Sequence, residues 1–255
     1  MRLLALVAAL SLSACSTSDG PPRPTTAADS LALAVVNAHG GWDAWSALQT
    51  VRFDWSVERD STELIRVRHL WDRAGSRARV EWPAGEDSIA VAVLDLAASA
   101  PEAAVGVAYV RGAEAAPEDS LVDQAYGRFI NDTYWMVAPL KTFDAGVTRA
   151  LAPDSASGET RVLALSFGDV GITPGDRYWL RVGPRGDLRA WTYVLEGDTT
   201  VSTWAWGGPE MVPAGRGHVT FLTRKTKPDG TAIVTTPLAV PESDSLWTSP
   251  LPILQ

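Results

Sequence analysis

Hydrophobic and polar positions alternate along much of the chain. Between residues 51 and 58, Val51, Phe53, Trp55 and Val57 alternate with charged or polar residues. Because successive side chains of a strand point to opposite faces of a sheet, this pattern predicts a strand with one buried face. Similar runs predict further strands at residues 65–72, 77–82, 160–167, 177–182, 188–195, 200–206, 218–225 and 231–240. The alanine-rich segments 88–96 and 105–111 suit a strand and a helix equally.

Other segments repeat at helical spacing. A helix is predicted from Asp29-Ser30, which suit its N-terminal cap, to Gly40-Gly41, which suit its end. A second short helical segment places Trp42, Trp45 and Leu48 on one side. The strongest helical pattern of the interior lies between Pro117 and Pro139, with residues three and four apart: Leu121, Val122, Ala125, Tyr126, Phe129, Ile130, Thr133 and Tyr134. Pro139 forces a stop, because proline cannot continue a helix.

The order of these elements predicts the fold class. About ten or eleven short strands without alternating helices indicate an α+β protein, with a curved, largely antiparallel sheet and helices set against one face. Turn residues separate the later strands, at 171–175, 183–187, 196–198, 207–209 and 228–230. No internal repeat and no shift of composition divides residues 29–255, so we expect a single domain.

The first residues are typical of a bacterial export signal. Arg2 precedes the apolar run Leu3 to Leu10, and Leu12-Ser13-Ala14-Cys15 follows. These four residues resemble the lipobox of bacterial lipoproteins, whose cysteine is acylated after cleavage. The resemblance implies a signal peptide at residues 1–14, a membrane anchor at lipidated Cys15 and, from Ser16 after it, an outer-membrane lipoprotein facing the periplasm. The alternative is a free thiol in an ordinary signal peptide. Residues 15–28 are polar and proline-rich, which predicts a flexible tether.

Composition and charge indicate a globular protein and bear on its partners. An apolar content of 46% with 20% charged residues describes an ordinary globular chain of 255 residues. The formal net charge of −8 argues against nucleic acid as a partner. Only three of the 22 basic residues are lysines, at positions 141, 225 and 227, a bias that we attribute to a GC-rich genome before any function.

No motif of catalysis or metal binding is visible. His39, His69 and His218 are scattered, without paired spacing and without a cysteine partner. The chain has no Gly-x-Ser-x-Gly elbow, phosphate-binding loop or dinucleotide fingerprint. We therefore predict a protein that is not an enzyme, with no catalytic residues, no metal and no cofactor, although residues distant in sequence can still meet in space.

Tryptophan is the unusual component. The chain contains 11, many at alternating positions of predicted strands: Trp55, Trp71, Trp82, Trp179, Trp191, Trp204 and Trp206. Each buried indole needs a partner for its N–H, so a set of rings on one sheet face suits a wide cavity with a partly polar rim. The alternative is a packed core, because a curved sheet also needs bulky side chains to fill its interior.

Two motifs carry a resemblance to a known family. They are His39-Gly40-Gly41-x-x-x-Trp45 and Asn131-Asp132-Thr133-Tyr134-Trp135-Met136-x-x-Pro139-x-Lys141-x-x-Asp144-x-Gly146-Val147. Together with the lipobox and the tether, they resemble bacterial outer-membrane lipoproteins of the LolA/LolB-like fold. The resemblance implies an unclosed antiparallel half-barrel over residues 29–255, with helices covering its concave apolar face. Named members of that family carry the acyl chains of lipoproteins to the outer membrane.

On that fold, the interior helix covers a hollow and Lys141 and Asp144 lie near its rim. The expected ligand is an apolar small molecule or acyl chain, and its predicted contacts are Trp55, Trp71, Trp82, Phe129, Tyr134, Trp135, Met136, Trp179 and Trp191. Two alternatives stay open. One is a module that binds a glycan or partner protein through exposed Trp204, Trp206 and Trp247, and the other is an envelope enzyme without a recognisable motif.

Overall fold

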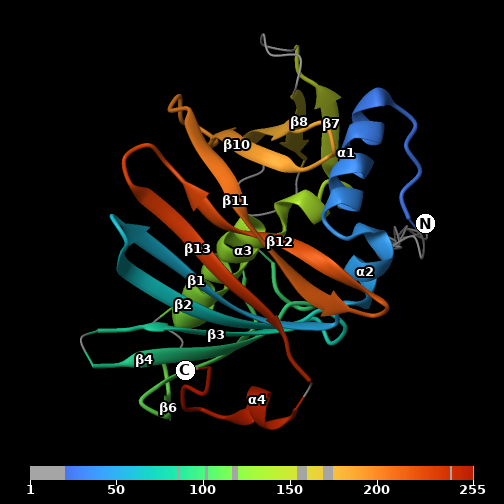
Figure 1. The fold of residues 1–255 in the computed structure, drawn as a ribbon. Coiled ribbons are helices and arrows are strands. Elements are labelled where there is room, and N and C mark those ends of the chain that lie inside the picture. Colours follow the sequence, from blue (N-terminus) through green and yellow to red (C-terminus); the bar gives the residue numbers. More distant parts are fainter. Residues whose placement is uncertain are drawn as a thin grey trace, which may run out of the picture.

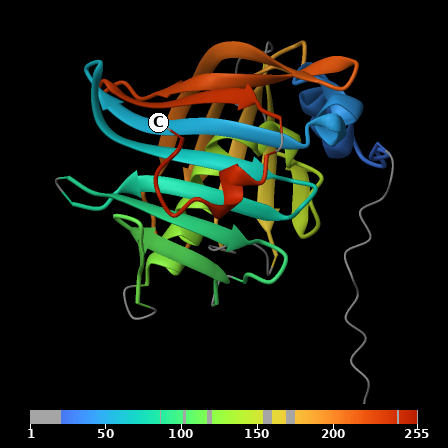
Figure 2. The same ribbon diagram turned by 90° about the horizontal axis from the view of Figure 1, so that it is seen from below.

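The computed structural model describes residues 21–85, 87–100, 103–116, 120–153, 160–168, 175–241 and 243–254. One antiparallel sheet dominates it and curves around a central helix without closing into a barrel (Figures 1 and 2). The predicted α+β half-barrel is confirmed, with 13 strands in place of the expected ten or eleven. The predicted signal peptide, Cys15 and Ser16 lie outside the described residues. No helix within the described ranges has both the length and the apolar character needed to cross a membrane.

The sheet is two meanders joined at β1 and β13. The first half contains β1 (Thr50–Arg59), β2 (Thr62–Asp72), β3 (Arg77–Pro83), β4 (Ile89–Asp95), β5 (Gly106–Val110) and β6 (Ala113–Glu114). The second half contains β7 (Val147–Leu151), β8 (Arg161–Phe167), β9 (Arg177–Val182), β10 (Leu188–Val194), β11 (Ser202–Ala214), β12 (Gly217–Thr226) and β13 (Thr231–Ala239). Because β1 pairs with β13, an early and a late segment of the chain form the middle of the sheet.

The alternating runs form strands as predicted, and the ambiguous alanine-rich segments are strands β4 and β5. Strand β7 was not predicted. The predicted turn at Gly207-Gly208-Pro209 is wrong, because β11 continues through it: Gly207 pairs with Arg224 and Pro209 pairs with Leu222. Glycine and proline favour turns locally, but pairing with β12 carries the strand through this segment, and Gly208 takes up the local irregularity with a φ of +66°.

Two helices stand at one end of the half-barrel. Helix α1 (Ala27–Ala38) is capped by Thr26, not by Asp29-Ser30 as predicted. The Thr26 hydroxyl accepts from the Asp29 backbone N–H at 3.0 Å, and the Asp29 carboxylate accepts from the Thr26 backbone N–H at 3.1 Å. Gly40 then turns the chain into α2 (Gly41–Ala47) with a φ of +112°, and a Cβ there would lie 2.3 Å from the carbonyl oxygen of His218. Only glycine fits both the φ angle and this contact.

The central helix α3 (Leu121–Val137) lies across the concave face and ends in a 3-10 helix, η2 (Ala138–Leu140), which contains Pro139 (Figure 1). Residues 117–119, predicted to begin this helix, lie outside the described residues. Helix α3 packs against β3, β4, β5 and β12. Buried Asp132 of α3 meets buried His69 of β2, with 2.9 Å between Oδ2 and Nε2. This pair fixes the helix to the first half of the sheet.

The chain end crosses the outer face of the sheet, where α4 (Ser245–Thr248) lies (Figure 2). There Trp247 and Leu254 form a small second core with Leu70. Buried Arg79 donates to the carbonyl oxygens of residues 249 and 251 at 2.7 and 2.6 Å. Its ion-pair partner Glu81, 2.7 Å away, accepts the backbone N–H groups of residues 253 and 254. The buried charges are thus satisfied by the chain end that they hold.

Candidate functional site

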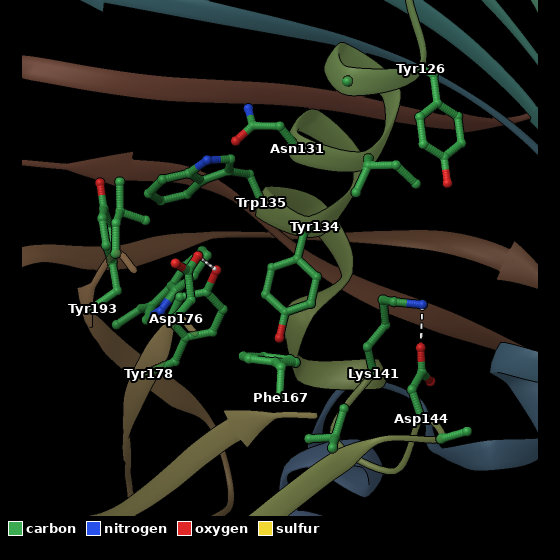
Figure 3. A pocket seen from close by; sticks show the side chains of 16 residues that line it. Tyr126, Asn131, Tyr134, Trp135, Lys141, Asp144, Phe167, Asp176, Tyr178 and Tyr193 are labelled. Carbon is green, nitrogen blue, oxygen red and sulfur yellow. Dashed lines mark hydrogen bonds and ion pairs between the residues drawn. The ribbon is translucent and has the colours of Figure 1, made fainter. Parts of the chain in front are cut away.

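A cavity of about 630 Å³ lies between α3 and strands β8 to β10. Figure 3 shows side chains from both layers pointing into it. Seven of the 16 residues that line it are aromatic: Tyr126, Tyr134, Trp135, Phe167, Tyr178, Trp191 and Tyr193. This volume falls in the range of roughly 300–1,000 Å³ that is typical of ligand pockets.

The cavity exists because α3 approaches the two halves of the sheet unequally. On the first half, the inward positions include Ala78, Ala90, Ala92 and Ala108, all buried, and α3 packs closely on β3, β4 and β5. Small side chains allow this close approach. On strands β8 to β10, the inward positions carry large rings, which hold the helix away from the sheet and leave space between them.

The rings contact one another around the cavity as well as facing it. Trp135 lies 4.5 Å from Trp191, measured between ring centroids, and Tyr178 lies 4.9 Å from Trp191. Tyr134 contacts Phe167 at 6.0 Å and Tyr178 at 5.7 Å. Edge and tilted geometries dominate these pairs, as expected from the aromatic quadrupole. The wall is therefore a connected aromatic surface supplied by one helix and three strands.

A few polar groups interrupt this surface. Burial raises the pKa of the Tyr134 hydroxyl well above its usual value, so it stays protonated and can donate to a ligand. The Trp191 indole N–H is buried without an acceptor among the described residues. The Tyr178 hydroxyl donates to Asp176 at 2.8 Å. At the rim, Lys141 and Asp144 form a half-exposed ion pair, which contributes little to stability.

The nine predicted contact residues lie in three different places in the structure: the cavity wall, the opposite face of the sheet and the packed interior. Tyr134, Trp135 and Trp191 line the cavity, and Lys141 and Asp144 lie at its rim. Trp179 points to the opposite face of the sheet, because it lies between inward-facing Tyr178 and Leu180. The other five belong to the packed interior on the first half of the sheet and the body of α3: Trp55, Trp71, Trp82, Phe129 and Met136.

Sequence reasoning missed Phe167, Tyr178 and Tyr193. Each of them occupies an inward position of an alternating strand, so the period-two pattern contained the signal that would have found them.

The structure also bears on the alternative of an exposed aromatic surface that binds a glycan or partner protein. Trp204, Trp206 and Trp247 are all buried, with at most 7% of each residue exposed, so they form no surface cluster.

His39 and Asp132 have structural partners. His39 Nδ1 lies 2.8 Å from the carbonyl oxygen of Val35, and burial lowers the pKa of its imidazole. Asn131 donates to Asp132 at 2.8 Å, on the carboxylate oxygen that His69 does not contact. Among the residues that the structure describes, no three His, Cys, Asp or Glu side chains gather as a metal site requires.

No protein-family model and no curated protein matches the chain. Among solved structures, it is similar to a DUF1329 family protein from Desulfovibrio piger, at 12% identity and a TM-score of 0.49, over 86% of this chain and 96% of that one. It is also similar to a LolA superfamily protein from Nitrosomonas europaea, at 10% identity and a TM-score of 0.46, over 87% and 97% of the two chains. A LolA superfamily protein is thus among the solved structures to which the chain is similar, and at these identities the likeness concerns the fold alone.

Proposed function

We propose that this chain is a lipid-anchored binding protein of the bacterial envelope, which holds an apolar ligand in the cavity beneath α3. The ligand is a lipid or an acyl chain, and the protein acts on it by binding and not by catalysis. The observation that carries this proposal is the aromatic cavity of about 630 Å³. Each methylene group that leaves water for such a cavity contributes roughly 0.8 kcal/mol, so a chain of moderate length binds well without many polar contacts.

The first test is direct extraction. The chain is expressed from Ser16 onward, which keeps every described helix and strand, and is purified without detergent. Organic extraction followed by mass spectrometry should find bound lipid. The stripped protein should then show a saturable change in tryptophan emission on titration with methyl laurate, because Trp135 and Trp191 line the cavity. A protein that is free of lipid and does not respond to the ester would contradict the proposal.

Gly127 offers a matched pair of variants. It lines the cavity from α3, and a Cβ built on it meets no atom within 4 Å. Gly127→Phe should fill the cavity and weaken methyl laurate binding at least tenfold, while Gly127→Ala should bind as the wild type does. Both replacements favour the helix, by up to about 1 kcal/mol for alanine, so a loss of folding does not explain a difference between them. Equal binding by the two variants would place the ligand elsewhere.

The proposed anchor is tested separately in cells. Metabolic labelling with an alkyne-bearing fatty acid should label the wild-type chain and leave Cys15→Ser unlabelled. Fractionation should find the labelled chain in the outer membrane. An unlabelled wild type would exclude the anchor and leave the cavity proposal standing, since the two rest on different residues.

A further inference from the structure

An amine is buried in the interior behind the wall of the cavity. Lys225 of β12 has no exposed surface, and it faces the concave side between Trp206 of β11 and Ile233 of β13, its partners in the sheet register. Its Nζ lies 5.0 Å from the centroid of the Trp206 ring and donates one hydrogen bond, of 3.2 Å, to the Thr235 hydroxyl. An ammonium group has three donors, so Thr235 satisfies only part of it.

No carboxylate compensates this amine. Among the residues that the structure describes, no ion pair includes Lys225. Desolvation lowers the pKa of its amine to about 7, and no neighbouring charge opposes that effect. Another cation of the same region, Lys227, follows β12 in the chain and lies over the ring of Trp204. The interior thus keeps a cation-forming group without a counter-charge.

Unpaired donors lie on the same face of the sheet as Lys225. The indole N–H groups of Trp55, Trp204 and Trp206 are buried and have no acceptor among the residues that the structure describes. At most 9% of each of these residues is exposed. Trp206 is directly opposite Lys225, and Trp55 is directly opposite Thr235. Buried donors normally have partners, so a cluster of unpaired donors around an amine indicates an acceptor that is supplied from outside the chain.

This donor cluster adjoins the cavity. Trp135 lines the cavity and contacts Trp204 at 5.1 Å and Trp206 at 6.4 Å between ring centroids. Trp191 also lines it and lies 5.6 Å from Trp206. Figure 3 shows the ring of Trp135 standing at the edge of the space below the helix. Trp135 thus stands between the cavity and the rings next to Lys225, so a change in its rotamer would connect the two.

We propose that the ligand is a long-chain carboxylic acid, whose carboxylate is bound by Lys225 and the indole N–H of Trp206 while its chain occupies the cavity. One amine balances one negative charge, which favours a carboxylate over a phosphate dianion. Two carboxylate oxygens also offer about four acceptor positions, enough for the unpaired donors. This inference rests on the proposed function and adds the chemical class of the head group.

The test compares lauric acid with methyl laurate, which has the same chain and no charge. At neutral pH, wild-type protein should bind the acid roughly tenfold or more tightly than the ester, since hydrogen bonds to a charged group are the stronger ones. Lys225→Met should bind both ligands equally, and Trp206→Phe should reduce the preference severalfold. Lys227→Met, at a lysine outside the cavity lining, should keep the full preference and serves as the matched control, and Lys141→Met tests the rim as the alternative position of the head group.

The outcomes separate the two proposals. If the wild type binds both ligands with equal affinity, the carboxylate inference is overturned and the apolar-ligand function stands. If the preference survives in Lys225→Met and disappears in Lys141→Met, the head group lies at the rim and the inference is equally wrong. If neither ligand binds, the proposed function itself fails. Should Lys225→Met not fold, equal binding of the two ligands by the wild type, or an unchanged preference in Trp206→Phe, would still overturn the inference.

Discussion

Replacing Lys225 by methionine should stabilise the empty protein. A pKa lowered from 10.5 to about 7 means that burial disfavours the charged amine by roughly 5 kcal/mol. Attraction to the Trp206 ring opposes this by about 1–2 kcal/mol, and the hydrogen bond to Thr235 is worth about 1 kcal/mol. Methionine has a similar shape and no charge. We therefore expect Lys225→Met to raise the free energy of unfolding by about 2–3 kcal/mol at neutral pH.

The pH dependence of this gain has a definite sign. The amine of Lys225 has a lower pKa in the folded than in the unfolded chain, so between about pH 7 and 10.5 the unfolded chain binds a proton that the folded chain lacks. The stability of the wild type therefore rises over this range, and below it the full penalty is present. From pH 7 to pH 9 the rise due to Lys225 is about 2 kcal/mol. The advantage of Lys225→Met should shrink by that amount.

The assay is urea unfolding at the two pH values, followed by tryptophan fluorescence and analysed with a common m-value. The difference in the free energy of unfolding between variant and wild type cancels the contribution from the titration of all other groups. Lys227→Met is the matched control, because Lys227 is only partly buried, and its effect should stay within about 0.5 kcal/mol. A Lys225→Met protein that is less stable than the wild type at pH 7, or a difference independent of pH, would refute the reasoning.

Three further substitutions test the contacts that hold the fold. Arg79→Ala leaves the Glu81 carboxylate buried and unpaired, so urea unfolding should show a loss of about 3–5 kcal/mol, and limited proteolysis should cut the chain end. Asp132→Ala removes the partner of the His69 ring, and we expect a loss of about 1–3 kcal/mol with faster hydrogen exchange in α3. Gly40→Ala brings a Cβ against a backbone carbonyl of β12 at a positive φ, so the melting temperature should fall by several degrees, at roughly 2–4 °C per kcal/mol. An unchanged value in any of these measurements would show that the contact is not needed.

The secondary structure could be predicted from local pattern to a large extent. Strand alternation is a property of neighbouring residues, so Phe53 and Trp55 predict a buried face wherever the strand lies in the sheet. The interior helix was predicted for the same reason. The pattern failed at Gly207-Gly208-Pro209, where residues that favour a turn lie within a strand because Gly207 and Pro209 pair with β12. Pairing with a distant strand is a tertiary effect that a local window does not contain.

The position of the cavity depends on the distance between helix α3 and each half of the sheet. The types of the residues do not by themselves determine this distance. Trp82 and Trp191 follow the same alternating pattern, yet α3 packs closely over the alanines beside the first and stands away from the second. Only the assembled sheet decides which ring is packed in the core and which lines the cavity.

The tertiary structure likewise decides the role of Lys225, whose sequence pattern is that of an ordinary lysine in a strand. Its surroundings come from register, because pairing across β11, β12 and β13 encloses its amine and leaves the indole donors beside it without acceptors.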